Sequence, residues 1–404
     1  MMADMAIARC TARFAMLLVV AVCALFAAVP VMAQTSAAEF RKFLTDKAAF
    51  ADQDLEILDK GEIVIKMLPV ADKQEIAVFG IVRVNVPGEL GLSAFAESLS
   101  QRKDSSFKGG GKFSSPPVAA DLKDLKNEDR DFQEMQKCVV GKCDLNLSAE
   151  MIRRLQAEVD WNAADHRERA TDLLRQMLAG YANDYSARGD SALGEYANRR
   201  EPVKLAENHR ALLDGSQIVR QFAPDFYEYL RKFPAAKLDG VENDLSWTMV
   251  DFGLNPMIAL THRAAFKRQT AGPEQIFIAA KQIFASRYVD SSLSFAVFLR
   301  MADTGAGYLI FTDRSRSDAL DGLFSGMTRR VVTTEANERV TRVLKNARAK
   351  LEAGPGRSSG NVPTEEVSGP VDLVLDYARD PRLQIIAVIL ALVAGYLIFK
   401  MARK

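Results

Sequence analysis

The stretch EIAVFGIVRVNVPGE, residues 75–89, decides the fold of this chain. Most residues of Glu75–Val86 are Ile, Val, Ala or Phe, a composition that favours a buried β-strand. Pro87 and Gly88 end the strand, because a Pro-Gly pair is typical of a turn. Residues 89–101 then place Leu92, Phe95, Ala96 and Leu99 on one helical face. The stretch therefore predicts a buried strand followed by a helix.

On either side of this unit, apolar periodicity predicts further strands and two flanking helices. A helix is expected over 36–51 and a strand over 62–66. Downstream, the period changes to two, and short turns containing Gly or Asp separate consecutive strands, which favours an antiparallel meander. The five strands of the meander are expected over 244–252, 257–267, 275–288, 293–301 and 308–312. A closing helix over 334–352 buries Val340, Val343, Leu344, Ala347 and Leu351.

The segment 104–240 is predicted to be a large, mainly helical insertion. Residues 104–117 contain a Gly triplet and Pro116-Pro117, which favour a loop. Helices are expected from Ser148 to about Val159 and over 163–185, 203–214 and 217–232, the last interrupted by Pro224. The predicted fold class is α+β: an antiparallel sheet packed on a long C-terminal helix, with this insertion and one C-terminal transmembrane helix. Residues 34–352 form the exported domain.

The strand ending in Val86-Pro87, the helix after it, the five-stranded meander and the closing helix together resemble the START-like (helix-grip) superfamily. The resemblance covers residues 85–103 and 241–352 in topology. It implies an apolar ligand held between the sheet and the last helix. The chain departs from the family in the insertion, where a short connection is usual.

The N-terminus has the three-part pattern of a secretory signal peptide. Arg9 and Arg13 precede an uncharged apolar run over 14–29, and 31–33 are small or apolar residues. Residues 1–33 are therefore expected to be removed. An uncleaved N-terminal anchor is the alternative. Val22 stands before Cys23, where a lipoprotein signal needs a small residue.

The C-terminus is predicted to be a single membrane anchor. Residues 382–400 contain a long run without charge, flanked by Arg and Lys, that is long enough to span a bilayer. Residues 353–381 begin with a Gly/Pro/Ser-rich stretch and form a flexible tether, and 401–404 form a cytoplasmic tail. The expected location is a bacterial-type inner membrane, with the domain facing the periplasm. Ala387, Ala391 and Gly395 share one helix face and favour self-association, although such residues are common in membrane spans.

Cys138 and Cys143 remain after signal removal, and an oxidising compartment favours a disulfide between them. A redox dithiol is the alternative, but two residues, not four, usually separate its sulfurs. The formal net charge of the whole chain is +1, which argues against a nucleic-acid partner.

No catalytic motif, metal site or cofactor site is predicted. His166 and His209 lie in polar helical stretches and are expected on the surface. His262 alternates with apolar residues on a strand, so it faces either a cavity or a packed core. Residues 313–317 match D-x-S-x-S, yet too few residues follow to build the fold that uses that motif for a metal.

Two functions are consistent with these patterns. The first is a membrane-anchored envelope protein that binds an apolar ligand such as lipid in a helix-grip cavity. Its candidate lining residues are His262, Phe266, Tyr288, Phe295, Arg314 and Arg316. The aromatic residues among them could instead fill a closed core. The second is a non-enzymatic envelope scaffold or protein-interaction module that binds a partner through its helical insertion.

Overall fold

The computed structural model describes residues 35–99, 107–251, 255–268, 273–321 and 325–354. The predicted signal peptide and membrane anchor lie outside these ranges. No helix within them is both long enough and apolar enough to cross a bilayer. The helices are α2 (Ala37–Lys47), α3 (Asp52–Asp59), α4 (Leu92–Leu99), α5 (Asp129–Lys137), α6 (Ala149–Glu158), α7 (His166–Arg188), α8 (Leu205–Gly215), α9 (Gln217–Phe222), α10 (Pro224–Arg231) and α11 (Ser325–Ala353), with the short 3₁₀ helices η1 (Ala119–Leu122), η2 (Gly189–Ala192) and η3 (Asp318–Leu320).

The strands are β1 (Val64–Met67), β2 (Glu75–Val84), β3 (Phe107–Lys112), β4 (Glu195–Tyr196), β5 (Val203–Lys204), β6 (Val241–Val250), β7 (Met257–Lys267), β8 (Gln275–Ala285), β9 (Ser291–Arg300) and β10 (Gly307–Arg316). Eight of them form one antiparallel sheet in the order β1-β2-β10-β9-β8-β7-β6-β3. The α+β class and the antiparallel meander β6–β10 are thus confirmed. The strand 75–84 pairs with β10 along its whole length, from Glu75↔Arg316 to Val84↔Gly307.

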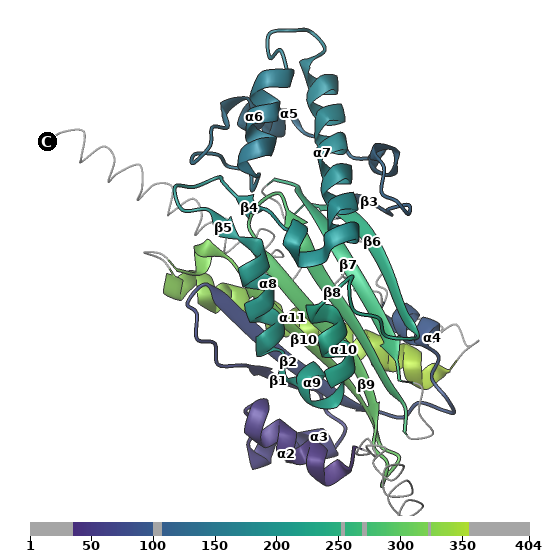
Figure 1. The fold of residues 1–404 in the computed structure, drawn as a ribbon. Coiled ribbons are helices and arrows are strands. Elements are labelled where there is room, and N and C mark those ends of the chain that lie inside the picture. The colour runs from purple at the N-terminus through teal and green to yellow at the C-terminus, as the bar shows by residue number, and fades with distance from the viewer. Residues whose placement is uncertain (1–34, 100–106, 252–254, 269–272, 322–324, 355–404) are drawn as a thin grey trace, which may run out of the picture. The chain divides into compact units, whose positions relative to one another are not determined.

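Helices cover both faces of the large sheet (Figure 1). The helices α4 and α11 pack on one face, where Val78, Phe298 and Phe311 contribute to the core. The helices α2, α3 and α8–α10 pack on the other face. There, the rings of Phe266 and Phe277 contact Phe226 of α10, and the ring of Tyr308 contacts Phe40 of α2. Phe295 belongs to the same core. These four meander aromatics therefore fill a packed core on the face that α11 does not cover, whereas Phe298 and Phe311 pack on the α11 face.

The part of the insertion that contains α5, α6 and α7 stands over one end of the sheet, on the same face as its later helices α8–α10 (Figure 1). Its core joins α5, α6 and α7 to Met249 of β6, Ile258 of β7 and Phe284 of β8. The expected loop over 104–117 is partly wrong, because Phe107–Lys112 form the edge strand β3. Its three glycines lie against Trp247: a β-carbon at Gly110 would lie 2.8 Å from the Trp247 backbone oxygen, and one at Gly111 would lie 3.1 Å from Nε1 of the indole. A Gly-rich composition therefore marks close packing here, not a turn.

Candidate functional site

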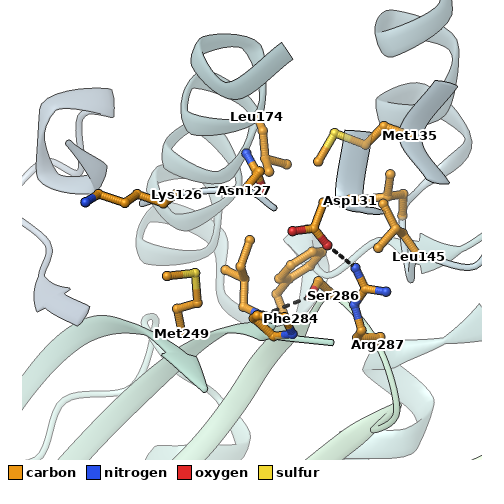
Figure 2. A pocket seen from close by; sticks show the side chains of 13 residues that line it. Lys126, Asn127, Asp131, Met135, Leu145, Leu174, Met249, Phe284, Ser286 and Arg287 are labelled. Atoms are coloured by element: carbon orange, nitrogen blue, oxygen red, sulfur yellow. Dashed lines mark hydrogen bonds and ion pairs between the residues drawn. The ribbon is translucent and has the colours of Figure 1, made fainter. Parts of the chain in front are cut away.

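A pocket lies between the insertion and the end of the sheet (Figure 2). It encloses an empty volume of about 400 Å³, which includes space open to solvent. Only about one or two water molecules fit inside it. Eight apolar residues line it: Met135, Leu145, Leu147, Leu174, Met249, Pro256, Ile258 and Phe284. Lys126, Asn127, Asp131, Ser286 and Arg287 supply the polar part of the lining.

Arg287 is the only cation buried in this lining, and two carboxylates of α5 enclose it. Its guanidinium forms ion pairs with Asp131 and Glu134, and all three residues are buried. Burial raises the pKa of Asp131, because the charged carboxylate loses hydration. The backbone N–H of Glu128 donates to the same carboxylate at 2.8 Å and opposes that rise. This cluster ties the first helix of the insertion to the turn after β8.

Two polar atoms of the lining have no hydrogen-bond partner among the residues that the structure describes. They are Oδ1 of Asn127 and Nε of Arg287. The Asn127 amide nitrogen donates to Thr171 at 3.1 Å, which fixes the orientation of the side chain. A buried acceptor and a buried donor without partners favour a bound water or the polar group of a small ligand at this place.

Beside the pocket, a disulfide closes the hairpin that joins α5 to Leu145. Cys138 and Cys143 are bonded, with a Cα–Cα distance of 4.4 Å, as expected from the sequence. Gly141 has a φ of +84°, which allows the tight turn between Val139 and Lys142. The hairpin is further held by the backbone N–H groups of Gly141 and Cys143, which donate to Ala197 at 2.7 Å and Asn198 at 3.0 Å.

The tip of this hairpin is apolar and exposed. Val139 is 53% exposed and Val140 is 49% exposed. Among the described residues, Val118 at 45% is the other exposed large hydrophobic residue. Lys137 and Lys142 flank the valines and are also exposed. The sequence predicted the disulfide between the two cysteines. It could not show that Val139 and Val140 are exposed, because the exposure of an apolar residue depends on the fold.

Contacts from three segments fix the hairpin to the turn between β8 and β9. Asn146 receives a hydrogen bond from Asn198 at 2.9 Å and donates to the Val289 carbonyl at 3.2 Å. Arg199 pairs with Asp290 at 2.8 Å and with Asp318 at 3.1 Å. Burial raises the pKa of Asp290 to about 6, although the Arg199 charge opposes this rise. The tip is therefore presented on a rigid base.

His262 lies in a buried chain of hydrogen bonds. Its Nδ1 is 2.9 Å from the Tyr185 hydroxyl, and its Nε2 is 2.9 Å from Oδ1 of Asn243. The Asn243 amide in turn donates to the Tyr229 hydroxyl at 2.7 Å. The centroid of the Phe233 ring lies 4.4 Å from the centroid of the His262 imidazole. Burial lowers the pKa of His262 to about 3, so the ring is neutral at pH 7. The hydrogen-bonding partners in this chain, Tyr185, Asn243 and Tyr229, are uncharged.

The expectation that His209 lies on the surface is wrong. It is 1% exposed, because the face of α8 that carries it packs against β9. Burial lowers its pKa well below the usual value. His166 is half-buried, and its Nδ1 lies 2.8 Å from the Ala163 carbonyl at the start of α7. Both histidines have charged neighbours in the sequence, so the sequence could not show that His209 is buried whereas His166 is only half-buried.

The other predicted lining residues do not share one cavity with His262. Phe266 and Phe295 lie in the aromatic core under α10. Tyr288 stands at the turn after β8, where its hydroxyl donates to the Asn255 carbonyl at 3.3 Å. Arg314 pairs with Glu75, and Arg316 pairs with Asp72. The two arginines do lie on one face of β10, since the strand continues to Arg316, but each already has a carboxylate partner.

Comparison with protein-family models, with curated proteins and with solved structures finds no match for this chain. The resemblance to the START-like superfamily therefore stays a prediction, as does a helix-grip ligand. Within the described ranges, no group of three or more His, Cys, Asp or Glu residues is placed to hold a metal ion. The two candidate sites are therefore the apolar hairpin tip and the narrow pocket beside it, which has an apolar and polar lining.

Proposed function

We propose that this chain is a non-enzymatic, membrane-tethered module of the cell envelope that binds a partner through the tip of its helical insertion. The observation that carries the proposal is the disulfide-closed hairpin with Val139 and Val140 exposed at its turn. Exposed apolar residues on a fixed base are typical of interaction sites, because little conformational entropy is lost when they bind.

The position of the tip supports this function. The C-terminal end of α11 lies at one end of the sheet, where the Asn85 backbone N–H donates to Glu352 at 3.1 Å. The hairpin is attached at the opposite end, beside Asp290. If residues 353–381 tether the domain to a membrane anchor, the tip points away from that anchor. It would then reach a partner in the envelope space.

The charges around the tip indicate the chemistry of the partner. Lys137 and Lys142 flank the valines, so an apolar recess bordered by carboxylates would complement the tip. A flat, uncharged surface would bury the valines and leave the lysines without partners. We therefore expect the partner to be a protein that has an apolar recess bordered by carboxylates.

Photo-crosslinking in intact cells tests this function. Val140 is replaced by a photoreactive amino acid in the full-length chain, and Val118 is replaced in the same way as the matched control. We expect one discrete adduct from position 140 and none from position 118. Changing Lys137 and Lys142 to Glu should abolish the adduct. Equal adduct patterns at the two positions, or no adduct at position 140, would refute the function.

The pocket supports a second function, binding of a small, mainly apolar molecule that carries a polar group. Its eight apolar lining residues and the unpartnered Asn127 oxygen favour such a ligand. Because the interior holds only about two waters, α5 and α7 would have to move away from the sheet on binding. Native mass spectrometry of the purified protein should find a co-purifying ligand that Leu174→Trp removes. A wild-type mass equal to that of the bare chain would exclude this second function.

A further inference from the structure

The acidic side chains beside the pocket outnumber the buried cations that the structure describes there. Asp131 and Glu134 are both buried, and they share the guanidinium of Arg287. Glu134 has a second partner, Arg130, at 3.1 Å, but the side chain of Arg130 is 67% exposed. Burial raises the pKa of Asp131, although the Arg287 charge opposes this rise. The charge of Asp131 is therefore only partly compensated.

Asn127 lines the pocket, and its side-chain oxygen lacks a hydrogen-bond donor among the described residues. The Thr171 hydroxyl donates its hydrogen to the Arg167 carbonyl at 2.8 Å, so it can only accept from Asn127. The amide nitrogen of Asn127 must therefore face Thr171, at 3.1 Å, and Oδ1 must point elsewhere. The other unpartnered atom of the lining, Nε of Arg287, is a donor, and one water molecule is enough for it.

Adaptable apolar side chains form the rest of the lining. Met135 of α5 and Leu174 of α7 face Met249 and Phe284 of the sheet across the pocket (Figure 2). A methionine side chain is unbranched and flexible, so two of them let the pocket enlarge around a short hydrocarbon chain. An aromatic ring attracts a cation that lies over its face. These walls therefore suit an apolar molecule that carries a positively charged group.

The chain segment at the mouth of the pocket is acidic. Residues 121–131 lead past the pocket into α5 and carry five carboxylates and three cationic side chains. Lys126 is the cation of this segment that lines the pocket, but it is exposed, and Figure 2 shows its ammonium group directed away from Asp131. A surplus of negative charge raises the local concentration of cations. The approach to the pocket therefore also favours a cationic ligand.

We propose that the pocket binds a small apolar amine in its protonated form. The ammonium group donates to Asp131 and to Oδ1 of Asn127, and the hydrocarbon part contacts the apolar walls. Hydrogen bonds between an ammonium group and a carboxylate are stronger than those between neutral groups. An alcohol would leave the Asp131 charge uncompensated, and a carboxylate ligand would be repelled by it. This inference rests on the second function proposed above, because it names the ligand class of the same pocket.

Methyl NMR of the full-length protein, labelled at the methionine methyl groups, tests the ligand class at the pocket itself. The probes are n-butylamine, 1-butanol and butyrate, which are similar in size and differ in charge. At neutral pH the amine is protonated, because its pKa lies near that of lysine. We expect n-butylamine to shift the signals of Met135 and Met249 at about tenfold lower concentration than 1-butanol, since a hydrogen bond to a charged group contributes more than a neutral one. Butyrate should cause no shift.

Two variants of neighbouring acids in α5 make the test specific. Asp131→Asn removes the charge that faces the pocket and should abolish the preference for the amine over the alcohol. Asp129→Asn is the matched control, because the side chain of Asp129 is 73% exposed and pairs with Arg167, and it should leave the preference unchanged. If Asp131→Asn does not fold, the ranking of the three probes by the wild-type protein decides the ligand class by itself.

The possible failures are distinguishable. Binding of 1-butanol as tight as that of n-butylamine would overturn the amine and leave the second function in place. Signals of Met135 and Met249 that respond to none of the probes would overturn both. A preference that Asp129→Asn removes as fully as Asp131→Asn would overturn the inference too, because it would come from the overall charge of residues 121–131 and not from the buried carboxylate.

Discussion

Gly80 of β2 lies directly beneath Val340 of α11. A β-carbon at position 80 would overlap Cγ1 of Val340 and would also lie 2.9 Å from Cδ1 of Leu344. The backbone of Gly80 has no positive φ, so its conformation suits any residue. Because Gly80 has no side chain, α11 can pack close to the sheet at this position.

Gly80→Ala should therefore destabilise the fold by overpacking. We expect the free energy of unfolding to fall by about 1–3 kcal/mol, because the helix must shift or Val340 must leave its preferred rotamer. Urea unfolding followed by circular dichroism measures this change. A variant as stable as the wild type would mean that α11 adapts without cost.

Gly180→Ala is the matched control, and its expected effect has the opposite sign. Gly180 lies inside α7, and a β-carbon there would meet no atom within 4 Å. Alanine should stabilise the helix by about 0.5–1 kcal/mol, since it loses less conformational entropy than glycine. Loss of stability at both positions would show that the cost at Gly80 is not specific to the contact with Val340.

Periodicity in the sequence predicted most of the sheet and its helices. The meander was found because its strands alternate between two covered faces and end at recognisable turns. The break at Pro224 was found because proline begins α10 and cannot continue α9. The edge strand β3 was missed, because glycines in a strand have no side-chain pattern to detect. The helix α5 has only Phe132 and Met135 as buried apolar residues in a charged segment, which is too weak a signal.

The candidate sites were less predictable than the fold. Arg287 and its two carboxylates are separated by more than 150 residues in the sequence, and nothing local pairs them. Whether Val139 and Val140 are exposed depends on the packing of segments around Ala197 and Val289. Local sequence could suggest the disulfide, since its cysteines are close in the chain, but not the surface that it supports.

Replacing Arg287 should be strongly destabilising. Arg287→Met would leave Asp131 and Glu134 buried and close together without a cation, and breaking a buried pair costs about 3–5 kcal/mol. The triple variant Arg287→Met, Asp131→Asn, Glu134→Gln should recover part of this loss, because it removes the unpaired charges. Urea unfolding of both proteins provides the comparison. A triple variant less stable than the single one would show that hydrogen bonds, not charge pairing, dominate here.

The stability of the protein should depend on pH through His262. Its pKa is about 3 in the folded state and about 6.5 when unfolded, so its stabilising contribution is complete above pH 6.5 and is lost as the pH falls. His262→Gln removes this dependence. Between pH 7.5 and pH 5, the wild type should lose about 2 kcal/mol relative to the variant. Parallel stability curves for the two proteins would show that His262 is protonated in the folded state.

For Asp290, stability should change with pH in the opposite direction, and Asp290→Asn tests this. The folded-state pKa of Asp290 is about 6, above the unfolded value of about 3.9, so its contribution is largest at low pH and is lost as the pH rises through 6. Over the same change from pH 7.5 to pH 5, the wild type should gain about 1 kcal/mol relative to this variant. Urea unfolding at the two pH values gives both differences.

Removal of the disulfide should affect the hairpin more than the rest of the fold. Closing so short a loop contributes about 2 kcal/mol by constraining the unfolded chain. In a variant with Cys138→Ala and Cys143→Ala, the hydrogen bonds from Gly141 and Cys143 positions to Ala197 and Asn198 remain possible. We therefore expect the hairpin to form but to open more often. Hydrogen exchange should show faster exchange at positions 141 and 143, while the amides of β8 and β9 remain protected. Unchanged exchange at those two positions would mean that the backbone contacts alone fix the tip, and that the disulfide is not needed to present Val139 and Val140.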